Sequence, residues 1–77
     1  MEEFIEYIAK KIVDHPENVS IEIRTSSENK TIISLRVHQD DVGKVIGKKG
    51  KTAEAMRTLL SAVASKDHQR AILEIVD

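Results

Sequence analysis

The sequence predicts a small two-layer α+β domain, and three features of the chain indicate it. Apolar residues recur at helical spacing near the N-terminus and again past the middle, whereas three other stretches alternate apolar and polar residues as strands do. The 77 residues suffice for one hydrophobic core and are too few for a second domain. No cysteine is present, so packing alone must hold residues 1–77 together as a single domain.

The N-terminal part of the chain predicts a helix followed by a hairpin. Residues 2–14 carry apolar side chains at helical spacing, and Pro16 ends that helix. Alternation over residues 19–25 and 31–38 predicts two strands. The polar turn at residues 26–30 is short enough to make these strands antiparallel neighbours.

The alternation also predicts how the strands are covered. Ile23 faces inward, whereas Ile32 interrupts the polar face of its strand and indicates an edge. A last strand over residues 70–76 has apolar residues on both faces, for example Ile72 and Leu73. We therefore expect a well-covered position for it.

Two helices joined by a glycine turn are expected before the last strand. Asp40 or Asp41 caps a short helix that ends at Ile46, and a second helix follows over residues 51–65. The second helix has a wide apolar face that commits four residues to burial, namely Met56, Leu59, Leu60 and Val63. The strands before and after this helix pair run parallel through a right-handed crossover. The predicted order is α-β-β-α-α-β, with a three-stranded mixed sheet and three helices on one face.

The run VIGKKGKT at Val45–Thr52 is the candidate functional site. Gly47 and Gly50 lack a Cβ atom, which lets the backbone bend sharply and lets another chain approach within contact distance. Lys48 and Lys49 place two positive charges at the tip of the turn. The unpaired N–H groups of the helix that follows point toward the same place. Together these features predict a phosphate-binding site.

The charges are distributed unevenly along the chain, although the formal net charge is −1. Residues 1–30 carry seven acids against four bases. Residues 43–70 carry seven bases against two acids. We therefore expect a basic end of the molecule centred on the glycine turn.

The run IGKKG at Ile46–Gly50 resembles the signature loop of KH domains, and the predicted order of elements resembles the type II KH fold. The chain length and the run Asp41–Thr52 are similar to the small stand-alone bacterial KH proteins of the KhpA family. This resemblance covers essentially the whole chain. It implies a non-catalytic protein that binds single-stranded RNA, about four nucleotides in one groove, and acts as an RNA chaperone or post-transcriptional regulator.

The resemblance also implies roles for individual residues. The loop residues would clamp the RNA backbone, apolar residues of both helices would line the groove, and nearby cationic or hydroxyl side chains are further candidate contacts. These groups are Gly47, Lys48, Lys49 and Gly50; Val42, Ile46, Ala53 and Met56; and Lys44, Lys51, Thr52 and Arg57. Ala53 stands where KH domains usually carry a bulky aliphatic residue, which predicts a shallower groove floor. The implied protein partner is a second copy of the chain, or a larger KH-containing protein in a heterodimer.

Other functions remain as alternatives. Two short helices joined by a glycine turn could form a helix-turn-helix DNA binder, although burial of the second helix argues against a free recognition helix. The wide apolar face of that helix could instead serve a protein-interaction or dimerisation module. A P-loop is excluded because Val45 occupies the position at which that motif requires glycine.

The sequence predicts no catalytic, metal or cofactor site and no small-molecule substrate. His15, His38 and His68 are expected in separate turns or strand ends, without the spacing of metal ligands. No apolar run approaches the roughly 20 residues that span a bilayer, and the acidic N-terminus is unlike a secretory signal. We therefore expect a cytoplasmic protein that has no membrane partner.

Overall fold

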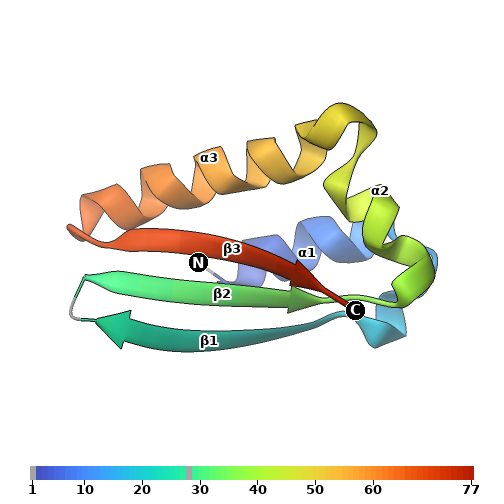
Figure 1. The fold of residues 1–77 in the computed structure, drawn as a ribbon, viewed down its shortest axis with the longest axis horizontal. Helices are drawn as coiled ribbons and strands as arrows, with labels where there is room; N and C mark the ends of the chain where they lie inside the picture. Colours follow the sequence, from blue (N-terminus) through green and yellow to red (C-terminus); the bar gives the residue numbers. More distant parts are fainter. Residues whose placement is uncertain (1, 28) are drawn as a thin grey trace.

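The computed structural model describes residues 2–27 and 29–77. In chain order the helices and strands are α1 Glu2–Ile12, β1 Ser20–Ser27, β2 Lys30–Arg36, α2 Val42–Ile46, α3 Lys51–Lys66 and β3 Arg70–Val76. Short 3₁₀ turns lie at Pro16–Asn18, Gln39–Asp41 and Lys48–Gly50. The order α-β-β-α-α-β is the predicted one (Figure 1). Glu28, in the predicted hairpin turn, lies outside the described residues.

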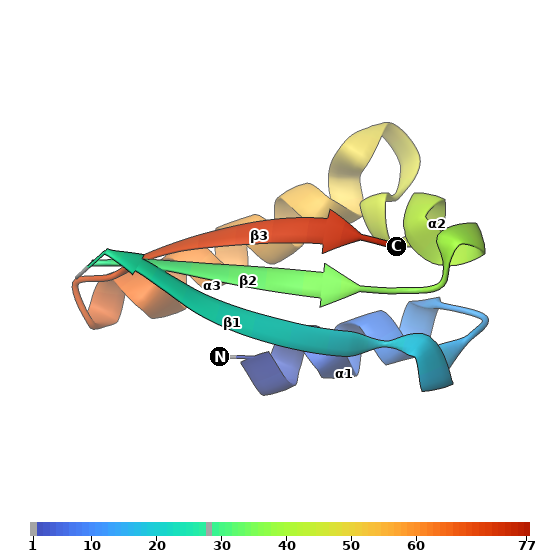
Figure 2. The ribbon, with the colours of Figure 1, turned by 60° about the horizontal axis from the view of Figure 1, so that its bottom comes forward.

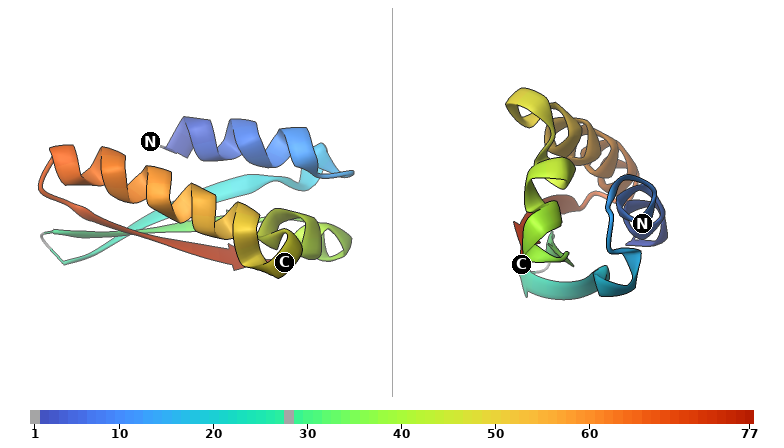
Figure 3. Two further views of the ribbon diagram at one scale, coloured as in Figure 1. Left: turned by 90° about the horizontal axis from the view of Figure 1, so that it is seen from above. Right: turned by 90° about the vertical axis from the view of Figure 1, so that its right-hand side faces the viewer.

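The three strands form one mixed sheet in the order β1-β2-β3. The first pair is antiparallel and the second is parallel, with Ile23, Ile33 and Leu73 in one row across the sheet. The helices lie on one face of this sheet (Figure 3). Figure 2 shows the opposite face, with the strands in front of the helices. This arrangement is the α+β type II KH fold that the sequence predicts.

The core lies between the helices and the inner face of the sheet. Its fully buried side chains come from every layer: Ile5 and Ala9 of α1, Ile33 and Leu35 of β2, Val45 of α2, and Leu60 of α3. The apolar residues recur at the helical and strand periods, so each element turns one stripe toward this core.

The burial predicted for helix α3 is wrong at two residues. Leu60 is fully buried, but the Leu59 and Val63 side chains are 48% and 40% exposed. A two-layer domain covers one stripe of α3, and residues one position away along a helix point about 100° aside. The exposed pair therefore lies on the flank of α3, beside the covered stripe.

Two predictions about the sheet are also wrong. Strand β3 is an edge strand and not a covered one, whereas Ile32 lies on the central strand β2. Ile32 and Ile72 are direct neighbours across β2 and β3, and both are half-buried. Two adjacent isoleucines shield each other on the outer face, which explains apolar residues on both faces of β3 without a covering layer. Ile23, on the edge strand β1, is 42% exposed.

Candidate functional site

The loop between α2 and α3 has a backbone that glycine makes possible. Gly47 has φ 81° and ψ 172°, a conformation essentially restricted to glycine. Lys49 and Gly50 follow in the left-handed region, with φ 56° and 73°. The N–H group of Gly50 donates to the carbonyl oxygen of Gly47 over 3.1 Å, which closes the turn. The backbone therefore reverses within four residues and turns Lys48 and Lys49 outward.

The two glycines are needed for different reasons. A Cβ atom at Gly47 would lie 2.7 Å from the Cβ of Thr52 and 2.9 Å from its backbone nitrogen. A Cβ atom at Gly50 would meet no atom within 4 Å. Gly47 therefore allows the loop to pack against the first turn of α3, whereas a side chain at Gly50 would project into the space above the loop. Thr52 lies directly under Gly47.

Three lysines present free charge at this loop. Lys48, Lys49 and Lys51 are exposed, and none of the ion pairs formed among residues 2–27 and 29–77 involves them. Arg57, on α3, is likewise exposed. The structure thus brings these cationic residues of the predicted site to the surface.

Lys44 is placed differently from the loop lysines. Its ammonium group pairs with the carboxylate of Asp14, just beyond α1. The hydrogen bond from Lys44 to Asp14 raises the pKa of the lysine. Lys44 therefore links α2 to the end of α1, and Asp14 already offsets part of its charge.

The apolar residues predicted to line the groove divide into two groups. Val42 is half-buried, and Ile46 is 39% exposed, so both offer surface on α2. Ala53 and Met56 are each only 2% exposed, and Met56 belongs to the core cluster. The two α3 residues predicted to line the groove therefore lie beneath the surface, because α3 turns both side chains toward the sheet.

A buried carboxylate, that of Asp41, holds the start of α2 through contacts that no local pattern predicts. Asp41 stands at the N-cap position, yet its side chain caps no helix, contrary to prediction. Its carboxylate accepts the N–H groups of Asp14 over 3.3 Å and His15 over 2.9 Å, and it lies 3.0 Å from Nδ1 of His15. Burial raises the pKa of Asp41, but these hydrogen bonds outweigh that effect and the pKa is lowered.

His15 and His38 are also brought together, although the sequence placed them in separate turns. Their rings stack with centroids 4.1 Å apart. Nδ1 of His38 accepts the N–H group of Asp40 over 3.0 Å, which caps the 3₁₀ turn before α2. The stack of His15 on His38 and the contacts of Asp41 join partners 23 or more residues apart, so no local pattern could reveal them. They fix the helix that leads into the loop.

A family model described as "KhpA/KhpB, KH domain" matches residues 2–75. The chain belongs to this KH-domain family. Three similar relatives are each named "RNA-binding protein KhpA". The relative from Treponema pallidum is 50% identical over 76 residues, 99% of this chain and 94% of the relative. The Borreliella burgdorferi protein is 48% identical over 75 residues, which are 97% of this chain and 90% of the relative. The Chlamydia muridarum protein is 46% identical over 77 residues, which are 100% of this chain and 97% of the relative. No solved structure matches the chain.

Two further properties bear on the kind of site. Within residues 2–27 and 29–77, no three His, Cys, Asp or Glu side chains are grouped so that they could hold a metal ion. In the same part of the chain, no helix is both long and apolar enough to span a bilayer.

Proposed function

We propose that this KH domain binds single-stranded RNA, without catalysis, through the loop Gly47–Gly50 and the adjoining surface of α2. The backbone of Gly47, which no other residue adopts easily, carries the proposal. It presents Lys48 and Lys49 at an exposed turn, with Gly50 leaving open space for a phosphodiester strand. The relatives' name, RNA-binding protein KhpA, supports RNA as the ligand.

The proposed contacts follow from exposure. Lys48, Lys49 and Lys51 neutralise phosphates, and Arg57 extends the basic surface along α3. Val42 and Ile46 support the nucleotides, whereas Ala53, Met56 and Thr52 act mainly by shaping the loop from beneath. Lys44 contributes least because Asp14 already holds it.

The Lys48→Asp, Lys49→Asp double variant tests this proposal. It reverses two charges on an exposed turn, so we expect RNA binding to fall below detection and the circular dichroism spectrum to stay unchanged. The matched control is Lys10→Asp, Lys11→Asp on the exposed side of α1, which makes the same change of charge away from the loop. Equal RNA binding by both double variants would show that the loop is not the site.

We further propose that the protein acts as a dimer, with a second copy or with a larger KH-containing protein. The exposed Leu59 and Val63 side chains of α3 support this proposal. Leu59 also lines a shallow hollow of about 440 Å³, together with Lys51, Glu54, Ala55 and Thr58. One loop with three free lysines should bind RNA weakly, and joining two domains raises the effective affinity.

Light scattering of the Leu59→Asp variant tests the dimer. Because Leu59 is half exposed, the variant should remain folded and elute as a monomer. Tyr7→Asp, on α1, is the control, since Tyr7 is 64% exposed and does not line this hollow. A wild-type chain that is already monomeric, alone and with a KH-containing partner, would exclude this proposal.

We also propose that the protein acts as a cytoplasmic RNA chaperone or post-transcriptional regulator. A helix-turn-helix reading loses its support because the chain belongs to a KH-domain family. Exposure of Leu59 and Val63 does remove the burial argument against that reading. Competition between duplex DNA and single-stranded RNA checks the point, and RNA should win.

A further inference from the structure

The proposed site offers little that could distinguish one base from another. The lysines meet phosphates, which are the same in every sequence. The apolar floor is reduced to Val42 and Ile46, because Ala53 and Met56 are 2% exposed. The aromatic residues Phe4 and Tyr7 are both on α1, away from the loop. Any base recognition must therefore come from elsewhere on the domain.

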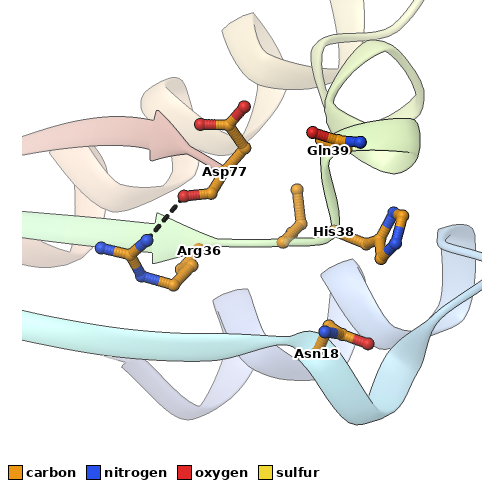
Figure 4. A pocket seen from close by; sticks show the side chains of 6 residues that line it. Asn18, Arg36, His38, Gln39 and Asp77 are labelled. Carbon is orange, nitrogen blue, oxygen red and sulfur yellow. Dashed lines mark hydrogen bonds between the residues drawn. The ribbon is translucent and has the colours of Figure 1, made fainter.

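A polar pocket, here called the β-end pocket, lies where β2 and β3 end (Figure 4). It is a wide, open hollow of about 470 Å³. Its lining residues are Asn18, Arg36, Val37, His38, Gln39 and Asp77. At its base, the N–H group of Val37 donates to the carbonyl oxygen of Val76 over 3.0 Å, which joins the ends of the two strands.

The β-end pocket lies before the start of α2 and at the end of β3. Gln39 begins the 3₁₀ turn that runs directly into α2, and Asp77 follows the last residue of β3. Helix α2 and strand β3 are in contact with each other. From Gln39 to Gly47 the helical rise amounts to roughly 13 Å, a length that a few nucleotides cover. A strand that lies on the loop and follows α2 toward its start therefore arrives at this pocket.

The chemistry of the pocket suits a nucleobase and not a phosphate. Arg36 supplies hydrogen-bond donors, and Asn18 and Gln39 supply both donors and acceptors. Arginine, asparagine and glutamine are the side chains that most often read base edges. The lining has one cationic residue, Arg36, and one anionic residue, Asp77, so the pocket has no formal excess of positive charge to attract phosphate.

Three contacts hold the polar groups in place. Nη1 of Arg36 donates to the backbone oxygen of Asp77 over 2.6 Å, as Figure 4 shows. The His38 ring is fixed by its stack on His15 and by the hydrogen bond that it accepts from Asp40. An imidazole held in this way offers a base a flat surface for stacking.

We propose that the β-end pocket is a base-reading subsite for the RNA strand whose backbone lies on the Gly47–Gly50 loop. This inference rests on the proposed function. Guanine is the favoured base, because Arg36 can only donate and guanine presents two neighbouring acceptors, O6 and N7. The loop then supplies binding energy, and the pocket supplies sequence preference.

Fluorescence anisotropy with matched RNA oligonucleotides tests the subsite. Each is a tetranucleotide extended on the 5′ or the 3′ side by four nucleotides, one of which is guanine, cytosine or an abasic residue. The abasic oligonucleotide has the same phosphate charge, so only the base differs. At one position of the extension, the oligonucleotide with guanine should bind roughly tenfold more tightly than the oligonucleotide with the abasic residue. This is the gain expected from one well-placed bidentate contact.

Arg36→Ala and Gln39→Ala should each remove most of this guanine preference and leave binding of the tetranucleotide within about twofold of wild type. Arg24→Ala is the control, because Arg24 lies on the same face of the sheet and has the same charge, but it pairs with Glu74 outside the pocket. Thermal unfolding confirms that each variant is folded.

The outcomes separate the two proposals. If wild type binds none of these oligonucleotides, the proposed function fails and the subsite fails with it. If wild type binds the tetranucleotide but shows equal affinity for guanine, cytosine and abasic extensions, the subsite alone is overturned. Equal effects of Arg36→Ala and Arg24→Ala would also overturn it.

Discussion

The three glycines of this chain offer a graded test of the loop geometry, because alanine has a different consequence at each. At Gly43, in α2, a Cβ atom meets no atom within 4 Å, and the backbone is helical. Alanine there should stabilise the fold by about 0.5–1 kcal/mol. At Gly50 the Cβ atom is equally free, but φ is 73°, which costs an alanine roughly 1–2 kcal/mol.

Gly47 should be the most sensitive of the three. Its φ of 81° with ψ of 172° is strained for any other residue, at roughly 1–3 kcal/mol. The new Cβ atom would also lie 2.7 Å from that of Thr52, so the first turn of α3 must shift as well. We therefore expect a total cost above about 3 kcal/mol, against a stability of about 4–12 kcal/mol for a domain of this size.

Thermal unfolding by circular dichroism measures these differences. One kcal/mol moves the Tm of so small a domain by about 4–8 °C. The Tm should decrease in the order Gly43→Ala, wild type, Gly50→Ala, Gly47→Ala, with the last at least about 12 °C below wild type. If Gly47→Ala and Gly43→Ala unfold at the same temperature, the loop does not have the backbone described here.

Three further predictions concern burial, pH and charge. Leu60→Ala should destabilise the fold by about 2–5 kcal/mol in urea titrations, and Leu59→Ala by about 1 kcal/mol or less, because only Leu60 is fully buried; equal losses would contradict this packing. The pKa of Asp41 is lowered in the folded protein, so its stabilising effect is present above the ordinary aspartate pKa of 3.8 and is lost as pH falls through the folded value. The free energy of unfolding of Asp41→Asn should therefore depend less on pH in this range than that of wild type. Lys44→Met should weaken RNA binding less than Lys49→Met in the same anisotropy assay, since Asp14 holds Lys44; the reverse order would make Lys44 a principal contact.

The elements of this fold were predictable because their signals are local. The apolar period of each segment set its type, and the predicted bounds of the helices and strands differ from the observed ones by two residues at most. The loop was predictable for the same reason, since Gly47–Gly50 is a continuous motif. The family resemblance and the order of elements then agreed with each other.

What the sequence could not predict depends on contacts between distant residues. Leu59 and Leu60 look alike in the pattern, and only the width of the layer beneath α3 exposes one and buries the other. Aspartate is a common helix cap, but the carboxylate of Asp41 instead accepts the N–H groups of Asp14 and His15. The partner of Lys44, 30 residues earlier, was hidden in the same way.

The salt dependence of RNA binding tests the central claim most directly, because it counts the phosphates that the protein neutralises. With Lys48, Lys49 and Lys51 free at the loop, the plot of log K against log salt concentration should have a slope of about −2, since each contact to a single strand contributes about −0.7. In the Lys48→Gln, Lys49→Gln variant the slope should rise to about −0.7. A slope near zero for wild type, or the same slope for both proteins, would contradict the claim that this loop binds the RNA backbone.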